Sequence, residues 1–267
     1  MEDQKKRQVE YHEREHYRLG HPRQADNRNP LIASLNSYRL RKMIEMIGVP
    51  LKGKSVLSVS GGDGDEADFL QRQGAVVTMT DLSAVAVETA RVRNPAIRSM
   101  KMDSENLAFE NGSFDWVVVR DGLHHLARPL KGLYELERVS REGFAILEGQ
   151  DSWLVRFLVK LRVGEDWDPA GGYTYRFTRR ELQKTFDSIQ ALSRWQIHTS
   201  WLPPGSDALK HFSAGMNFAN PVLNQPLILS RMGRTFLKSL FHGGNFLAGR
   251  WGNSLIVVAW KKPVNFE

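Results

Sequence analysis

The chain has 267 residues, of which 41% are apolar and 25% charged, a composition typical of a globular protein rather than a disordered or fibrous one. It contains no cysteine, which excludes disulfide bonds, thiolate metal sites and thiol catalysis. No apolar run reaches the roughly 18 residues of a membrane-spanning helix, and no apolar stretch follows the charged start. We therefore expect a cytoplasmic protein without a secretory signal.

The formal net charge of +7 is spread unevenly along the chain. Residues 1–50 carry +3, residues 51–150 carry −3 and residues 151–267 carry +7. No acidic residue stands between Asp207 and Glu267. The basic character therefore belongs mainly to the C-terminal part, which is where we look for its meaning.

Residues 1–50 are predicted to form an N-terminal helical cap. The first 20 residues are crowded with charge around a thin aromatic stripe, as in a solvated helix. Asn29 and Pro30 then supply an N-cap and a first helical residue, and apolar spacing continues to Gly48.

Residues 51–150 alternate short apolar runs with helical spacing. Strands are predicted at 55–60, 75–80, 96–102, 114–119 and 143–147, with helices at 64–73, 83–93 and 130–139. This alternation indicates βαβ units, and hence an α/β domain with a parallel sheet and right-handed crossovers.

The pattern loosens in residues 151–252. Helices are predicted at 153–163 and 178–186, a Gly- and aromatic-rich loop at 164–177, a strand at 192–201 and an inserted lid with one amphipathic helix at 203–250. Residues 253–267 are predicted to contain a final strand, at 253–260, and a tail.

The first predicted strand runs into a glycine turn, with Gly61, Gly62 and Gly64, and then into a helix. Glycines let a ligand approach the backbone, and a helix N-terminus presents N–H groups to an anion. By itself such a turn serves equally well to close a strand–helix unit.

Acidic residues close the next strands: Asp81 the second, Asp103 the third, and the pair Arg120-Asp121 the fourth. Asp81 follows the last glycine by 17 residues, where an acid can accept both hydroxyls of a ribose. Ligands of open α/β sheets bind beyond the carboxyl ends of the strands. The succession of strand ends therefore predicts a nucleoside site.

Five segments in this order resemble the motifs of class I S-adenosylmethionine-dependent methyltransferases, especially the quinone-biosynthesis C-methyltransferases and their small-molecule relatives. They are residues 56–64, 80–83, 102–109, 114–126 and 133–139, and the resemblance spans roughly residues 35–150 and the last strand. It implies a Rossmann-like fold whose seven-stranded sheet has the order 3-2-1-4-5-7-6, with the last strand antiparallel.

The resemblance also implies roles in binding S-adenosyl-L-methionine. Ser60, Gly61, Gly62 and Gly64 would wrap its methionine part, with Val119 and Arg120 lining the same end. Asp81 would hold the ribose, Leu82 would pack on the adenine, and Asp103 would accept from the adenine amine beside Ser104. The chain departs from the family in having Ser58 where an acid is usual and Ser60 where a glycine is usual.

His124 and His125 follow the fourth strand, close to the expected position of the transferred methyl group. A histidine can take a proton from a hydroxyl or an amine. We interpret His124 as a packing residue and leave both roles, base and packing, open for His125. Asp121 has no second ligand at metal-binding spacing, so we expect no metal.

Residues outside the core are candidates for acceptor binding. Tyr17 and Arg39 could cap the cofactor, and an aromatic wall could include Trp153, Trp167, Tyr173, Tyr175 and Arg176. Packing within the lid or along a helix is the alternative for each of them. The amphipathic segment 226–241 could dock on the sheet, contact an anionic membrane surface or frame an acidic substrate.

The prediction is a methyltransferase that methylates an O, N or C atom of a small-molecule biosynthetic acceptor, with acidic and lipid-linked acceptors included. One alternative is a nucleic-acid methyltransferase. The net charge favours it, but the segment Arg120-Asp-Gly-Leu differs from Asn-Pro-Pro-Tyr, so we do not expect a nucleic-acid partner. The other is a cofactor-binding protein that does not methylate, suggested by Ser58 and Ser60. The acceptor and the oligomeric state are left open.

Overall fold

A seven-stranded sheet forms the centre of the computed structural model, which describes residues 2–15, 30–160, 167–168, 172–200, 243 and 249–263. Its strand order is β3-β2-β1-β4-β5-β9-β8. The strands are β1 (Ser55–Val59), β2 (Val76–Asp81), β3 (Arg98–Lys101), β4 (Phe114–Arg120), β5 (Ser140–Gly149), β8 (Leu192–Ser200) and β9 (Ser254–Lys261).

Strands β1 to β5 pair in parallel, and β9 lies antiparallel between β5 and β8. The last strand of the chain thus enters the sheet between the fifth and the sixth. This confirms the predicted order, the antiparallel last strand and the Rossmann-like class.

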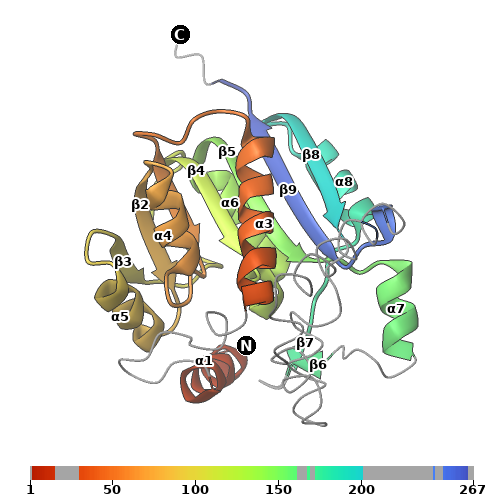
Figure 1. Cartoon of the computed structure of the whole chain (residues 1–267), viewed down its shortest axis with the longest axis horizontal. Coiled ribbons are helices and arrows are strands. Elements are labelled where there is room, and N and C mark those ends of the chain that lie inside the picture. Colours follow the sequence, from red (N-terminus) through yellow and green to blue (C-terminus); the bar gives the residue numbers. More distant parts are fainter. Residues whose placement is uncertain are drawn as a thin grey trace.

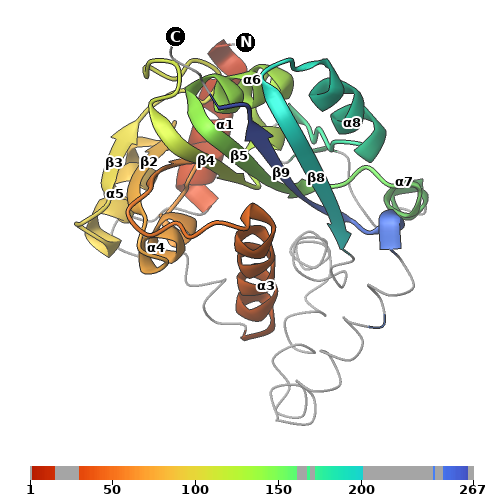
Figure 2. The same cartoon turned by 90° about the horizontal axis from the view of Figure 1, so that it is seen from above.

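Helices cover both faces of the sheet, as Figure 2 shows from above. One face carries α3 (Pro30–Ile47), α4 (Asp65–Arg72) and α5 (Ala84–Arg93), and the other carries α6 (Pro129–Val139) and α8 (Arg179–Ser188). Alternate residues of each strand serve the two cores: Val56 and Val118 pack with the first group, and Leu57 and Val119 with the second. Both faces are therefore apolar, and polar groups collect at the strand ends.

Local signals explain where the helices begin. The Ser83 hydroxyl accepts from the Ala86 N–H and caps α5, while Thr178 and Glu181 form a reciprocal capping box on α8. Pro30 is the first residue of α3, as its fixed φ favours.

Several elements lie outside the sheet and its covering helices. Helix α1 (Glu2–Glu15) lies beneath the carboxyl ends of the parallel strands in Figure 1, and α7 (Trp153–Lys160) follows β5. The segment predicted as a loop at 164–177 contains two short antiparallel strands, β6 (Trp167–Asp168) and β7 (Gly172–Tyr173). Short 3-10 turns form η1 (Leu123–His125) and η2 (Gly249–Trp251).

None of the helices in the described ranges is long and apolar enough to cross a membrane. Tyr17, the segment 226–241 and nearly all of the predicted lid at 203–250 lie outside the described residues.

Candidate functional site

The turn between β1 and α4 is the centre of the site. Gly62 and Gly64 have φ values of 58° and 86°, in the left-handed region that glycine adopts without strain. Ser60 is also left-handed, with φ 52°, although it carries a Cβ, and its hydroxyl lies 2.9 Å from that of Ser104. The turn thus faces the end of β3, where Ser104 stands.

Asp81, the last residue of β2, braces this turn. Its Oδ2 accepts from the Gly62 N–H at 2.9 Å, and its Oδ1 accepts from the Ser83 N–H at 2.9 Å. A carboxylate oxygen has two lone pairs, so accepting one N–H group does not by itself prevent it from accepting from a ligand hydroxyl. Leu82, next to it, is half-buried.

Asp103, just beyond β3, is already in contact with the N-terminal helix. Its Oδ2 accepts from Lys5 Nζ of α1 at 2.6 Å, and its Oδ1 accepts from the Glu105 N–H at 2.9 Å. Partial burial raises the pKa of Asp103, but the bonds from Lys5 and Glu105 outweigh burial and leave the pKa below its ordinary value. Asp103 is therefore ionised and acts as an acceptor.

The end of β4 presents charged side chains to the same edge. Arg39 of α3 donates two hydrogen bonds to Asp121, of 2.7 and 2.8 Å, and Arg120 approaches Glu66 of α4. Burial raises the pKa of Asp121, but Arg39 overrides it and holds the pKa well below its ordinary value. Val119, by contrast, is completely buried in the α6-side core, so its side chain does not line the site.

His124 is held by a carboxylate that the sequence prediction did not include. Glu148, at the end of β5, is 1% exposed and receives the Gly122 and Leu123 N–H groups on Oε1 at 2.9 and 2.6 Å. Its Oε2 lies 2.6 Å from His124 Nδ1, so the two side chains share a hydrogen bond. The His125 ring lies against His124, with 4.0 Å between the ring centroids.

The predicted aromatic wall is split between two environments. Trp153 and Phe157 stack on the exposed side of α7, and Tyr173 is exposed on β7. Tyr175 instead packs edge-on against Phe177 and donates to Glu181 of the α8 capping box. Burial and Glu181 raise the pKa of Tyr175 to about 12. Arg176 lies beside Gly149 at the end of β5, and Trp167 is exposed.

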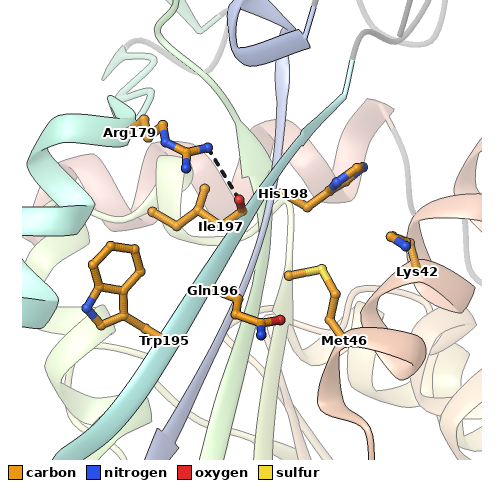
Figure 3. A pocket seen from close by; sticks show the side chains of 7 residues that line it. All are labelled: Lys42, Met46, Arg179, Trp195, Gln196, Ile197 and His198. Carbon is orange, nitrogen blue, oxygen red and sulfur yellow. Dashed lines mark hydrogen bonds between the residues drawn. The ribbon is translucent and has the colours of Figure 1, made fainter. Parts of the chain in front are cut away.

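A hollow of about 460 Å³ lies at the β8 edge, away from the strand ends. Figure 3 shows Met46 and Lys42 of α3 facing His198, with the Arg179 guanidinium bonded to the Ile197 carbonyl. None of the predicted cofactor or catalytic residues lines this hollow. The strand-end edge is therefore the better candidate site.

Among the described residues, no group of three or more His, Cys, Asp or Glu side chains is arranged to hold a metal ion.

A family model described as a methyltransferase domain matches residues 57–147, from β1 to β5. This match covers the glycine turn and the ends of β2, β3 and β4, and it stops one residue before Glu148. Residues 57–147 are thus similar to a methyltransferase domain.

Sequence similarity to curated relatives covers only part of the length of each relative. The chain is 30% identical over 125 residues to a demethylmenaquinone methyltransferase of Clavibacter sepedonicus, which is 46% of this chain and 51% of that protein. The chain thus spans about half the length of these curated relatives.

Solved structures show the same fold. The YcgJ protein of Bacillus subtilis has a TM-score of 0.57 and 19% identity, covering 86% of this chain and 100% of that one. A phosphoethanolamine N-methyltransferase of Haemonchus contortus, solved with S-adenosyl-L-methionine, has a TM-score of 0.56 and 16% identity, covering 85% of this chain and 53% of that one. The fold shared with these structures therefore extends well beyond residues 57–147.

Three residues of this edge escaped the sequence prediction: Lys5, Glu66 and Glu148. Glu66 and Lys5 look like ordinary solvated helix residues in the sequence. Glu148 does close the fifth predicted strand, so its position at a strand end was the signal that pointed to it.

Proposed function

We propose that the protein is an S-adenosyl-L-methionine-dependent methyltransferase acting on a small-molecule acceptor. The observation that carries the proposal is the hydrogen bond from the Gly62 N–H to Asp81, which joins the glycine turn to the end of β2. Asp103 and Arg120 stand at the same edge of the sheet. The methyltransferase family match and the bound cofactor of the structural neighbour support it.

The side chains present fit this cofactor. Asp81 and Asp103 offer carboxyl oxygens to ribose hydroxyls and an adenine amine at the ends of β2 and β3, and the left-handed turn keeps side chains away from the ligand. Arg120 and Asp121 supply both signs of charge where an amino-acid group would lie. S-adenosylmethionine, when bound, supplies a methyl group on a sulfonium that is already activated for transfer.

The protein's contribution is to hold the acceptor in line and to exclude water, which can lower the barrier by roughly 7–11 kcal/mol. Glu148 fixes His124, and His124 supports the His125 ring. His125 is then the group that takes a proton from the acceptor when the attacking atom must lose one. His124 acts as its positioning residue.

The acceptor we propose is a hydroxylated aromatic ring with a lipid tail, of the demethylmenaquinone kind, because the relative with that name matches the domain. Exposed Trp153, Phe157 and Tyr173 supply aromatic surface beyond the end of β5.

The test is transfer of a radiolabelled methyl group from S-adenosylmethionine to a panel of acceptors, including demethylated naphthoquinols, phosphoethanolamine and transfer RNA. The proposal predicts label in the naphthoquinol. Label only in RNA would contradict the small-molecule proposal. Cofactor binding without transfer to any acceptor would favour a protein that binds the cofactor for another purpose.

A further inference from the structure

Four charged side chains gather on the α3/α4 face of the sheet, at the carboxyl ends of β1 and β4. They are Arg39, Glu66, Arg120 and Asp121, two positive and two negative. Asp121 is accounted for by its two hydrogen bonds from Arg39. Glu66 and Arg120 are less well satisfied.

Glu66 stands in the first turn of α4 and is 2% exposed. Its Oε1 accepts from the Ser58 hydroxyl at 2.9 Å, and its Oε2 lies 3.7 Å from Arg120 Nε, beyond hydrogen-bond distance. Burial raises the pKa of Glu66 to about 6, although Arg120 and Ser58 oppose the change. Burying a carboxylate costs free energy of desolvation, and such a loose ion pair offsets little of that cost.

Arg120 ends β4, directly beside the glycine turn. The register pairs Val59 with Val119, so Arg120 continues next to Ser60. The Arg120 side chain is 14% exposed, and within the described part of the chain its one ion pair is with Glu66. A guanidinium has five N–H donors in a planar fork that matches a carboxylate. Most of the five N–H donors of Arg120 can therefore bond to a group other than Glu66.

The place of Arg120 in the sheet indicates what it meets. Asp81 and Asp103 lie at the ends of β2 and β3, on one side of the β1 turn, and Arg120 lies at the end of β4, on the other side. A nucleoside held by Asp81 therefore extends its other end toward Arg120. In S-adenosylmethionine that end is an amino acid, with one ammonium and one carboxylate.

We propose that Arg120 binds the carboxylate of the cofactor's amino-acid end and that Glu66 is the positioning residue that holds the Arg120 guanidinium for this contact. The inference rests on the proposed function and adds to it the pair that selects the amino-acid end. Glu66 does not touch the cofactor, because it is buried beneath Arg120 and Ser58. Its effect passes through the orientation of Arg120.

Calorimetry with two ligands separates this role from a general structural one. S-adenosylhomocysteine carries the amino-acid end, and 5′-methylthioadenosine keeps the adenosine and the sulfur but lacks that end. For Arg120→Met we expect affinity for S-adenosylhomocysteine to fall by about tenfold or more, as for a lost charged hydrogen bond. Affinity for methylthioadenosine should stay within about twofold.

Glu66→Gln should reduce the preference for S-adenosylhomocysteine in the same direction but less, and Arg120→Lys should keep part of it. Glu142→Gln and Arg141→Met are matched controls, because their ion pairs lie at the opposite end of the sheet. Both controls should keep the wild-type preference. Arg120→Lys also keeps the test decisive if the Gln variant does not fold.

The inference would be overturned if the Arg120 and Glu66 variants lost affinity for both ligands equally, or lost affinity for neither. Binding of methylthioadenosine to the wild type would in that case still support the proposed cofactor site. Failure of the wild type to bind either ligand would instead contradict the proposed function itself.

Discussion

Asp81 is oriented before any ligand binds, because the N–H groups of Gly62 and Ser83 each bond to one of its oxygens. A carboxylate held in this way loses little conformational freedom when a ribose arrives. The same bonds stabilise the glycine turn, so Asp81 serves the fold and the site together.

Asp81→Asn should weaken S-adenosylhomocysteine binding by about tenfold or more, since an amide offers one acceptor oxygen in place of a charged pair. Titration calorimetry measures this. Asp115→Asn is the control, because Asp115 likewise accepts backbone and hydroxyl bonds from Ser55, but at the other end of β1. Unchanged affinity in Asp81→Asn would rule out the ribose contact.

The two adjacent histidines should separate in their effects. His124→Ala leaves buried Glu148 without its side-chain partner, so the free energy of unfolding should fall by about 2 kcal/mol. His125→Ala should lower kcat by about a hundredfold. Urea unfolding measures the free energy of unfolding, and turnover measures kcat. Full turnover in His125→Ala would exclude His125 as the base.

The sequence alone could place side chains that directly follow a strand at the sheet edge, but it could not find the partners that the fold brings to them. Asp81 and Asp103 could be found because an apolar run ends just before each of them. Glu66 could not, because it stands beside Asp65 in a charged first turn and only the packing of α4 on β1 buries it. Val119 was also predicted to line the methionine end, and strand alternation places its side chain in the core on the α6 side of the sheet.

At the scale of elements, helix α1 is the part of the fold most directly tied to the nucleoside end. Lys5 bonds to Asp103 and lies 3.1 Å from Glu105, while Glu13 accepts from the Ser83 hydroxyl. Burial lowers the pKa of Lys5, but the bonds to Asp103 and Glu105 outweigh it and raise the pKa overall. The helix is thus held by charge at the residues that we propose bind adenosine.

Lys5→Ala should lower the free energy of opening α1 by about 1 kcal/mol and speed hydrogen exchange of its amides about fivefold. Lys6→Ala is the matched control, since Lys6 is exposed and its Nζ lies 3.9 Å from Glu10 Oε1, which is too far for a hydrogen bond. Equal exchange in the two variants would show that Lys5 does not hold the helix.

Most of the elements could be read from the sequence because their signals are local. Ser83 and Thr178 cap the predicted helices, and Asn29-Pro30 marks the start of α3. The β6–β7 pair was missed because its strands are two residues long, too short for any periodicity to show. The sheet order rested on the family resemblance, since a seventh strand inserted beside the fifth has no local signal.

For the whole molecule, Glu66 links stability to pH. Its folded-state pKa of about 6 lies above the ordinary value of 4.5, so the folded state binds the proton more tightly than the unfolded state. A raised acid pKa means that Glu66 contributes least to stability above pH 6 and progressively more as the pH falls toward 4.5.

Glu66→Gln does not titrate, so the wild type should gain up to about 2 kcal/mol of stability relative to this variant between pH 7 and pH 4.5. Urea unfolding of both proteins at several pH values measures the difference. A difference that stays constant over this range would show that Glu66 has an ordinary pKa.

The central claim is that the carboxyl ends of β1 to β4 form one adenosyl site. A crystal structure of the protein with S-adenosylhomocysteine tests it most directly. We expect the ribose hydroxyls to lie on Asp81, the adenine beside Asp103 and the amino-acid carboxylate on Arg120. Density for the ligand at the β8 hollow, or at any place away from Asp81, would contradict it.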